Sequence, residues 1–216
     1  MIMYTHICTH NLIVLFEVNM FLVSFVGLNG CGKTTQATLL RDRLKRDGFN
    51  SIKLKSIPED QRELYLQLMD SNSVEANHFL FCMLYQKQVD EIQKYLSKGF
   101  VVITDRFWES FATYHRQEGL IFKGLSSLYY ELENLIFAKT PISLGFYLNV
   151  PLNSSYSRIV ERNRGDANYE TSESFHHKTT FFEDLCIQDT WHAIDGTQPT
   201  ETIHDYVFRQ VINSLN

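Results

Sequence analysis

Short apolar stretches alternate with longer amphipathic stretches along most of the chain. Five short stretches have the apolar, β-prone character typical of strands buried in a parallel sheet. These candidate strands span residues 21–26, 52–55, 100–103, 144–148 and 191–194. Between them, apolar residues recur at the three- to four-residue spacing of a helix. The candidate helices span about residues 33–46, 60–70, 74–97, 124–137, 152–163, 172–186 and 200–214.

This alternation of strands and helices predicts an α/β fold, a doubly wound parallel sheet of five strands covered by helices on both faces. The chain of 216 residues is long enough for one such domain, and it contains no repeat or low-complexity linker. Ligands of open α/β sheets bind beyond the carboxyl ends of the strands. We therefore expect functional residues in the segments that directly follow the candidate strands.

The first nineteen residues differ from this pattern, and we expect them to be an N-terminal extension to a single domain that spans residues 20–216. Their apolar run is too short to cross a bilayer, and they lack the basic start and cleavage site of a signal peptide. His6, Cys8 and His10 alternate and could bind a metal, although a loosely held extension is the simpler interpretation. Because Met20 directly precedes the first strand, we expect a chain that starts there to fold and remain active.

The composition limits the classes of partner. With 25 acidic and 20 basic residues the chain has a net charge of −5, which argues against general binding to nucleic acid or to an anionic membrane. Phosphate ligands must then be bound by local basic clusters. The four cysteines, Cys8, Cys31, Cys82 and Cys186, have no paired spacing, which favours a reducing, intracellular (cytoplasmic) setting.

A glycine-rich motif directly follows the first candidate strand. The segment reads Gly27-Leu28-Asn29-Gly30-Cys31-Gly32-Lys33-Thr34-Thr35 and fits Gly-x-x-x-x-Gly-Lys-[Ser/Thr]. A strand, a glycine loop and a helix form the arrangement that wraps backbone N–H groups around the phosphates of a nucleotide. Lys33 can reach the β- and γ-phosphates, and the Thr34 hydroxyl can ligate Mg²⁺. Cys31 is interpreted as a small filler beside the glycines, since phosphoryl transfer needs no thiol.

Two basic clusters add to the phosphate chemistry. Asp105 and Arg106 follow the third candidate strand, where an acid usually serves the metal and an arginine can neutralise phosphoryl charge. Arg158, Arg162 and Arg164 lie within seven residues, a grouping that suits a mobile lid. A salt-bridged helix start and a solvated helix face are the structural alternatives for these two clusters.

Aromatic residues and a turn complete the set of candidate site residues. Phe81 and Tyr85 lie one turn apart on a candidate helix, and either could stack on a base. Core packing is the expected role of Phe79. Residues 194–199 predict a strand end, a turn and then a helix that starts at Pro199.

From about Phe21 to the C-terminus, the order and spacing of these motifs resemble the thymidylate kinases, a family of P-loop nucleoside monophosphate kinases. The resemblance rests on residues 27–36, on Asp105-Arg106-Phe107 with Ser110 and Tyr114, on residues 162–165 and on residues 194–199. It implies a P-loop NTPase three-layer sandwich with a short helical lid at about residues 158–170. It also implies transfer of the γ-phosphoryl group of ATP to dTMP, giving dTDP, with Mg²⁺ as cofactor. Family members are commonly dimers, so a homodimer is expected by resemblance.

The resemblance implies the following roles. The ATP-binding residues would be Gly27, Asn29, Gly30, Cys31, Gly32, Lys33, Thr34, Thr35, Thr197 and Gln198. The acceptor-binding residues would be Arg62, Phe81, Tyr85, Arg106 and Tyr114. Catalysis would fall to Lys33, Asp105, Arg106, Arg158, Arg162 and Arg164, and the metal would be served by Thr34 and Asp105. Gly30 occupies the loop position where some members carry a catalytic arginine, so the chain resembles the type that uses lid arginines.

Most departures from the family pattern concern the acceptor. The usual carboxylate at the third loop position is Asn29, and the arginine expected one turn after Phe81 is Tyr85. The other departures are His115 in place of glutamine, Arg62 as the only arginine of residues 58–62, and Asn168-Tyr169 in place of an Asp-Arg pair. Two alternatives therefore stay open: a related kinase with another deoxynucleoside monophosphate as acceptor, and a nucleotide-binding homologue without catalytic activity.

Overall fold

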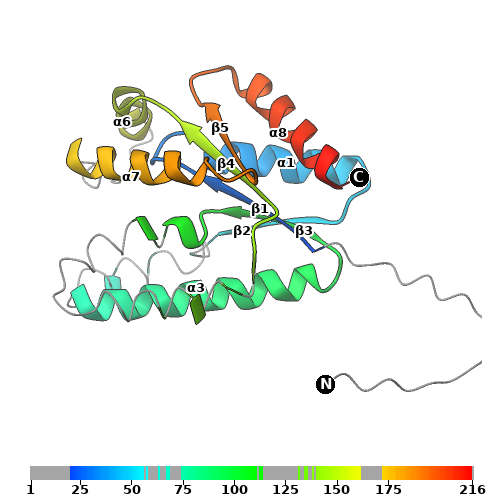
Figure 1. Cartoon of the computed structure of the whole chain (residues 1–216), viewed down its shortest axis with the longest axis horizontal. Helices are drawn as coiled ribbons and strands as arrows, with labels where there is room; N and C mark the ends of the chain where they lie inside the picture. The colour runs from blue at the N-terminus through cyan, green and yellow to red at the C-terminus, as the bar shows by residue number, and fades with distance from the viewer. Residues whose placement is uncertain are drawn as a thin grey trace, which may run out of the picture.

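A parallel sheet of five strands forms the middle layer of the molecule (Figure 1). Its strands are β1 (Phe21–Val26), β2 (Ser51–Lys55), β3 (Val101–Asp105), β4 (Leu144–Asn149) and β5 (Trp191–Asp195), in the spatial order β2-β3-β1-β4-β5. The computed structural model describes residues 20–55, 57, 63, 67–68, 74–110, 112–113, 131, 134–135, 138, 140–161 and 172–215. The predicted parallel α/β fold is confirmed.

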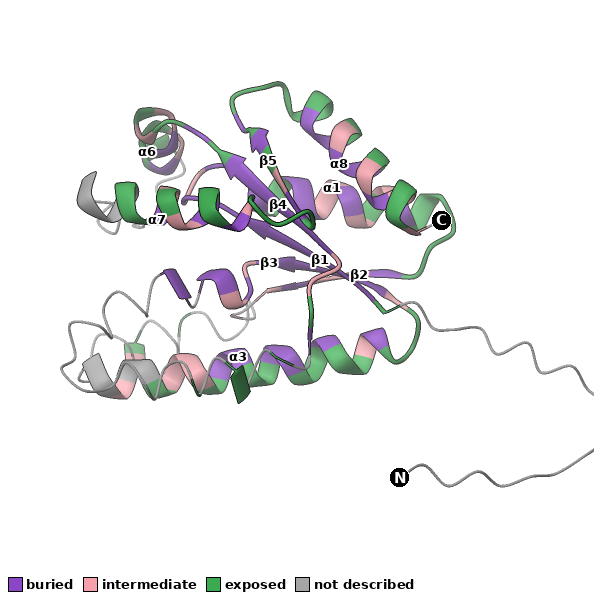
Figure 2. Cartoon of the chain, in the orientation of Figure 1, coloured by how far each residue is buried: buried purple, intermediate pink, exposed green. Residues whose placement is uncertain are grey.

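Helices cover both faces of this sheet. The long helices of the described residues are α1 (Lys33–Arg46), α3 (Val74–Leu96), α6 (Leu152–Glu161), α7 (Ser172–Leu185) and α8 (Thr200–Leu215). Helices α1 and α8 pack on one face, and α3 and α7 pack on the other. The strands between them are the most buried part of the chain (Figure 2).

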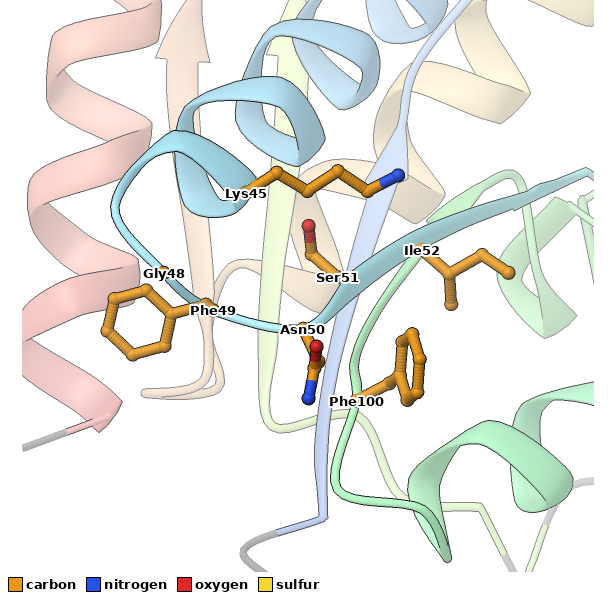
Figure 3. A pocket seen from close by; sticks show the side chains of 7 residues that line it. All are labelled: Lys45, Gly48, Phe49, Asn50, Ser51, Ile52 and Phe100. Carbon is orange, nitrogen blue, oxygen red and sulfur yellow. The ribbon is translucent and has the colours of Figure 1, made fainter.

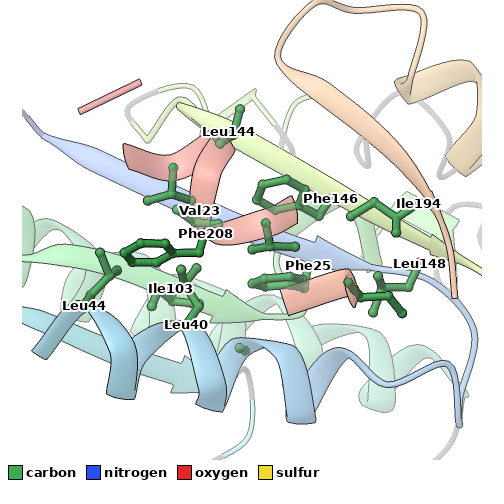
Figure 4. Close-up of a cluster of buried hydrophobic side chains, with 14 of the residues drawn as sticks. Val23, Phe25, Leu40, Leu44, Ile103, Leu144, Phe146, Leu148, Ile194 and Phe208 are labelled. Atoms are coloured by element: carbon green, nitrogen blue, oxygen red, sulfur yellow. The ribbon is translucent and has the colours of Figure 1, made fainter. Parts of the chain in front are cut away.

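The larger core cluster lies between the sheet and helices α1 and α8 (Figure 4). Phe25 and Phe146 stack with their ring centroids 5.4 Å apart, and Leu40 of α1 and Phe208 of α8 pack on the same cluster. On the opposite face, Leu22 and Val102 pack against α3, while other apolar residues of the sheet pack against α7. The apolar stretches of the sequence thus face helices on both sides, as buried parallel strands must.

The two edges of the sheet differ in what they carry. The phosphate loop and the segments after β3 and β5 all lie at the carboxyl edge, as expected for ligand-binding segments. At the amino edge, the turn that joins α1 to β2 lines a separate pocket with Lys45, Phe49 and Phe100 (Figure 3).

The predicted element boundaries agree with the structure to within one or two residues for the strands and for α1, α3, α6, α7 and α8. Most of the candidate helices at 60–70 and 124–137, the extension 1–19 and most of the expected lid lie outside the described residues. Within the part of the chain that the structure describes, none of the helices is long and apolar enough to span a membrane.

Candidate active site

Three glycines shape the loop between β1 and α1. Gly27, Gly30 and Gly32 have φ angles of 137°, 79° and 106°, values that residues with a Cβ rarely adopt. A Cβ on Gly30 would lie 2.6 Å from the backbone oxygen of Ser155, so that position excludes side chains by contact as well as by backbone conformation. The loop therefore takes a path that depends on glycine, with backbone close to α6.

Lys33 is the buried cation of this loop. Its side chain is 5% exposed, and its Nζ donates hydrogen bonds to the backbone oxygens of Gly27 at 2.9 Å and Leu28 at 2.6 Å. The Sγ of the buried Cys31 lies 3.5 Å from the same Nζ. The loop thus encloses one positive charge, as expected for a site that receives phosphate groups.

Thr34 and Asp105 bring two elements together at the carboxyl edge. The Thr34 hydroxyl, in the first turn of α1, donates a hydrogen bond of 2.6 Å to Oδ2 of Asp105 at the end of β3. Asp105 is 8% exposed, whereas Thr34 lies exposed at the surface of the site. A hydroxyl and a single carboxylate are hard oxygen donors, and Mg²⁺ is usually bound by few protein groups together with phosphates. This donor pair therefore fits Mg²⁺.

Arg106 follows Asp105 in an unusual backbone conformation. Its φ of 77° is the only positive φ of a residue other than glycine among the described residues. The backbone oxygen of Arg106 accepts a hydrogen bond of 3.0 Å from Nε2 of Gln88 on α3. Its guanidinium donates to Oδ1 of Asn29 in the phosphate loop. Strained backbone of this kind is common at functional sites, and here it directs a guanidinium over the loop.

Helix α6 packs against the opposite side of the phosphate loop. The Ser155 hydroxyl donates to the backbone oxygen of Asn29. The Arg158 guanidinium lies 3.5 Å from the backbone oxygen of Gly30 and 3.4 Å from that of Gly196. Arg158 therefore joins the loop to the turn between β5 and α8. Of the three arginines predicted to form the lid, it is the one that lies within the described residues.

A pocket of about 500 Å³ opens between these three segments. Thr35 of α1, Arg158 of α6 and Gln198 of the turn before α8 all line it. That turn is closed by Asp195, whose Oδ1 accepts hydrogen bonds from the Thr197 hydroxyl at 2.6 Å and the Thr197 amide at 2.9 Å. The same two bonds lower the pKa of Asp195, because they stabilise its charged form. The pocket is continuous with the phosphate loop and has room for a ligand attached to the phosphates.

The aromatic residues of α3 are buried to different degrees. Tyr85 is 5% exposed in the cluster under β1, β2 and β3, and Phe81 is partly buried against the same cluster. The prediction that Phe79 packs in the core is wrong, because this side chain is 64% exposed. Phe79 and Phe81 are two positions apart on α3, so the two side chains lie on different sides of the helix.

Glu109 is a buried acid that the sequence motifs did not reveal. Its side chain is fully buried, its Oε2 accepts a hydrogen bond of 3.3 Å from the Ser24 hydroxyl, and its Oε1 has no partner among the described residues. Burial raises the pKa of Glu109 to about 8. A charged residue among apolar ones after β3 was the signal available in the sequence, but it did not indicate burial.

Besides the aromatic residues of α3, three groups of predicted site residues can be distinguished. Asn29, Lys33, Thr34, Asp105 and Arg106 meet at one end of the sheet. Arg158 and Gln198 meet the loop from the opposite side. The third group, Arg62, Tyr114, Arg162 and Arg164, together with Asn168 and Tyr169, lies outside the described residues.

A phosphate loop after the central strand of a parallel sheet, with a lysine, a threonine and an aspartate at its carboxyl edge, defines the class of P-loop nucleotide-binding proteins. The family model of thymidylate kinase matches residues 25–207. The chain belongs to the thymidylate kinase family and is an ATP-dependent phosphotransferase.

Three thymidylate kinases match this chain over most of their own length. It is 29% identical to a thymidylate kinase of Plasmodium falciparum over 197 residues, 88% of each chain. It is 27% identical to a thymidylate kinase of Fervidobacterium nodosum over 202 residues, 90% of this chain and 98% of the relative. It is 30% identical to that of Dinoroseobacter shibae over 156 residues, 69% of this chain and 73% of the relative.

Proposed function

We propose that the chain transfers the γ-phosphoryl group of ATP to dTMP and gives dTDP, with Mg²⁺ as cofactor. The observation that carries the proposal is the hydrogen bond between Thr34 and Asp105 beside the buried Lys33. It joins a nucleotide-binding loop to a carboxylate in the arrangement that phosphoryl transfer requires. Membership of the thymidylate kinase family supports dTMP as the acceptor.

The residues of the site would act by positioning and by neutralising charge, because phosphoryl transfer needs little covalent help from the protein. Lys33 would exchange its bonds to loop carbonyls for bonds to phosphate oxygens. Arg106, held by Asn29 on the acceptor side of the loop, would orient the acceptor phosphate. No strong general base is needed, since the acceptor phosphate is already anionic.

Two further groups would act on the transferring phosphoryl group. Thr34 and Asp105 would hold Mg²⁺, which would supply positive charge to neutralise the donor phosphates. Arg158 would bridge the loop and the β5–α8 turn while the donor nucleotide is bound. Arg162 and Arg164 are proposed to complete the lid, so that three cations surround the transferred group.

A coupled assay with ATP and a panel of nucleoside monophosphates tests this function. ADP release with dTMP well above all other acceptors is the expected result. A preference for another monophosphate would overturn the acceptor assignment and leave the kinase assignment intact. Absence of ADP release with every acceptor, in a protein that still binds ATP, would overturn the kinase assignment itself.

A further inference from the structure

Lys53 and Lys55 of β2 lie on the same face of the sheet as the candidate metal-binding residues Thr34 and Asp105. Lys53 and Lys55 are two residues apart, so both point to the same face of the strand. The Lys53 Nζ donates a hydrogen bond of 2.7 Å to the Thr38 hydroxyl, which identifies that face as the one covered by α1. Lys55 is in register with Asp105 on the neighbouring strand, and residues in register share a face.

Three hydrogen bonds connect Lys53 to the active site. The Thr38 hydroxyl accepts from Lys53 and donates at 2.7 Å to the backbone oxygen of Thr34. The Thr34 hydroxyl in turn donates to Asp105 at 2.6 Å. A cation on the outermost strand β2 is therefore linked, through one threonine, to the residue that carries a metal-binding hydroxyl in the first turn of α1.

The electrostatic environment of Lys53 is unfavourable to a lone cation. Burial lowers its pKa, while the negative charge of Asp105 opposes that effect and the positive charges of Lys55 and Arg41 add to it. Asp42 acts in the same direction as Asp105. Lysines on outer strands commonly extend into solvent to block strand pairing. Lys53 is instead partly buried and hydrogen-bonded toward α1, so solubility alone does not account for its placement.

We propose that Lys53 is a positioning residue for phosphoryl transfer, which holds the first turn of α1 through Thr38 and thereby fixes Thr34 beside Asp105. Its ammonium, together with that of Lys55, adds positive charge on the β2 side of the site, opposite Arg158 of α6. This inference rests on the proposed function, since it names a further residue that supports the same site. Residues in the shell behind metal ligands commonly act in this way.

Two single variants and their combination test the inference. Lys53→Met removes the charge and the hydrogen bond, while Thr38→Val removes only the hydroxyl that links Lys53 to Thr34. Calorimetry measures the affinity for a non-hydrolysable ATP analogue with Mg²⁺, and steady-state kinetics measures kcat and both KM values. We expect each variant to lower the affinity and kcat about tenfold, the lower end of the range seen for residues behind metal ligands. The KM for the acceptor should stay at the wild-type value.

Matched controls separate positioning from a general loss of stability. Lys98→Met removes an exposed lysine from the turn after α3, and Thr180→Val removes a hydroxyl on α7 that donates to a backbone oxygen four residues earlier, as Thr38 does. Both controls should behave like wild type. The double variant Lys53→Met with Thr38→Val should lose no more than the more affected single variant, because both changes break one path.

The outcomes distinguish this inference from the proposed function. Wild-type affinity and kcat in Thr38→Val, with Lys53→Met equally unaffected, would overturn the role of Lys53 and leave kinase activity standing. If Lys53→Met fails to fold, Thr38→Val decides alone, because it keeps the charge and nearly the same side-chain volume. A wild-type protein that binds the Mg²⁺ complex of the analogue but phosphorylates no monophosphate would overturn the proposed function, and the calorimetry would still test Lys53.

Discussion

The donor and acceptor sides of this site are built from different kinds of contact. On the donor side, one short loop contributes buried backbone, three glycines with positive φ and a lysine bonded to the loop's own carbonyls. On the proposed acceptor side, the candidate residues are side chains on separate elements: Asn29 with Arg106, and the aromatic residues of α3. The donor side fits its motif throughout, while the acceptor side carries the departures from the family pattern.

This difference shows which kind of site tolerates substitution. A glycine at a positive φ cannot be replaced without strain, so the loop sequence can change little while the loop keeps its shape. The residues proposed to bind the acceptor contribute side chains from separate elements, so one of them can be replaced while the backbone remains in place. Four predictions test the donor and acceptor sides, and one tests the buried acid Glu109.

The largest effect should come from the donor side. Lys33→Ala removes the one cation enclosed by the phosphate loop, and we expect kcat to fall about 10²- to 10³-fold, as when a residue that stabilises the transition state is deleted. Kinetics with saturating ATP and dTMP measures the loss, and circular dichroism checks that the fold survives. Near-normal turnover would show that the loop does not bind the transferring phosphate.

The buried acid Glu109 should give the next largest effect. Burial raises the pKa of Glu109 to about 8 from its ordinary value of 4.5. Between these values the folded protein keeps a proton that the unfolded chain has released, so the free energy of unfolding falls as pH rises. The slope from Glu109 is at most about 1.4 kcal/mol per pH unit across this window. Urea unfolding from pH 5 to pH 8 should show a smaller decline in Glu109→Gln, and equal declines would contradict the burial of a neutral acid.

Backbone strain on the donor side comes third. Gly30→Ala would place a Cβ 2.6 Å from the backbone oxygen of Ser155 at a φ of 79°. We expect a loss of about 1–3 kcal/mol in the free energy of unfolding from strain of this kind. Gly48→Ala is the matched comparison, because Gly48 has a φ of 90° but a Cβ on it would meet nothing within 4 Å. An equal loss in the free energy of unfolding in the two variants would show that the contact with α6 does not contribute to the destabilisation.

The acceptor side should respond in the KM for the acceptor. Phe81→Ala removes the ring predicted to stack on the acceptor base, and stacking of a base on an aromatic ring contributes about 1–3 kcal/mol. We expect the KM for dTMP to rise about tenfold and the KM for ATP to stay constant. The exposed Phe79, on another side of the same helix, provides the control variant Phe79→Ala. A rise in the KM for dTMP of the same size in both variants would contradict stacking by Phe81.

The smallest effect should come from Asn29→Asp. This change restores the carboxylate usual in the family and gives the hydrogen bond from Arg106 a charged acceptor in addition to its charged donor. We expect a lower KM for dTMP by a factor of about three, the size of a modest gain in a charged hydrogen bond. Kinetics with dTMP and with its 3′-deoxy analogue measures it, because a carboxylate near the 3′-hydroxyl should favour dTMP. An unchanged ratio between the KM values of these two acceptors would show that the residue at position 29 does not contact the sugar.

The sequence predicts the local features of this molecule better than the contacts between distant positions. The strands, the five long helices and the phosphate loop were predictable, because apolar periodicity and glycine spacing are local properties. The contact of Arg106 with Asn29 joins positions 77 residues apart and depends on how the strands are ordered. The exposure of Phe79 and the burial of Glu109 were not predictable, since helical spacing alone does not tell which side of α3 faces the sheet or what fills the space beside Ser24.

Gln88 gives the acceptor side a property that its contacts alone do not suggest. This buried residue of α3 holds the backbone oxygen of Arg106, on a helix that also carries Phe81 and Tyr85 at spacings of seven and three residues. The anchor of the strained arginine and the candidate base-contacting residues are therefore separate positions on one rigid support. Replacing the residues at positions 81 and 85 while retaining Gln88 is a practical route to redesigning the preferred acceptor, since the arginine proposed to orient the acceptor phosphate would keep its anchor.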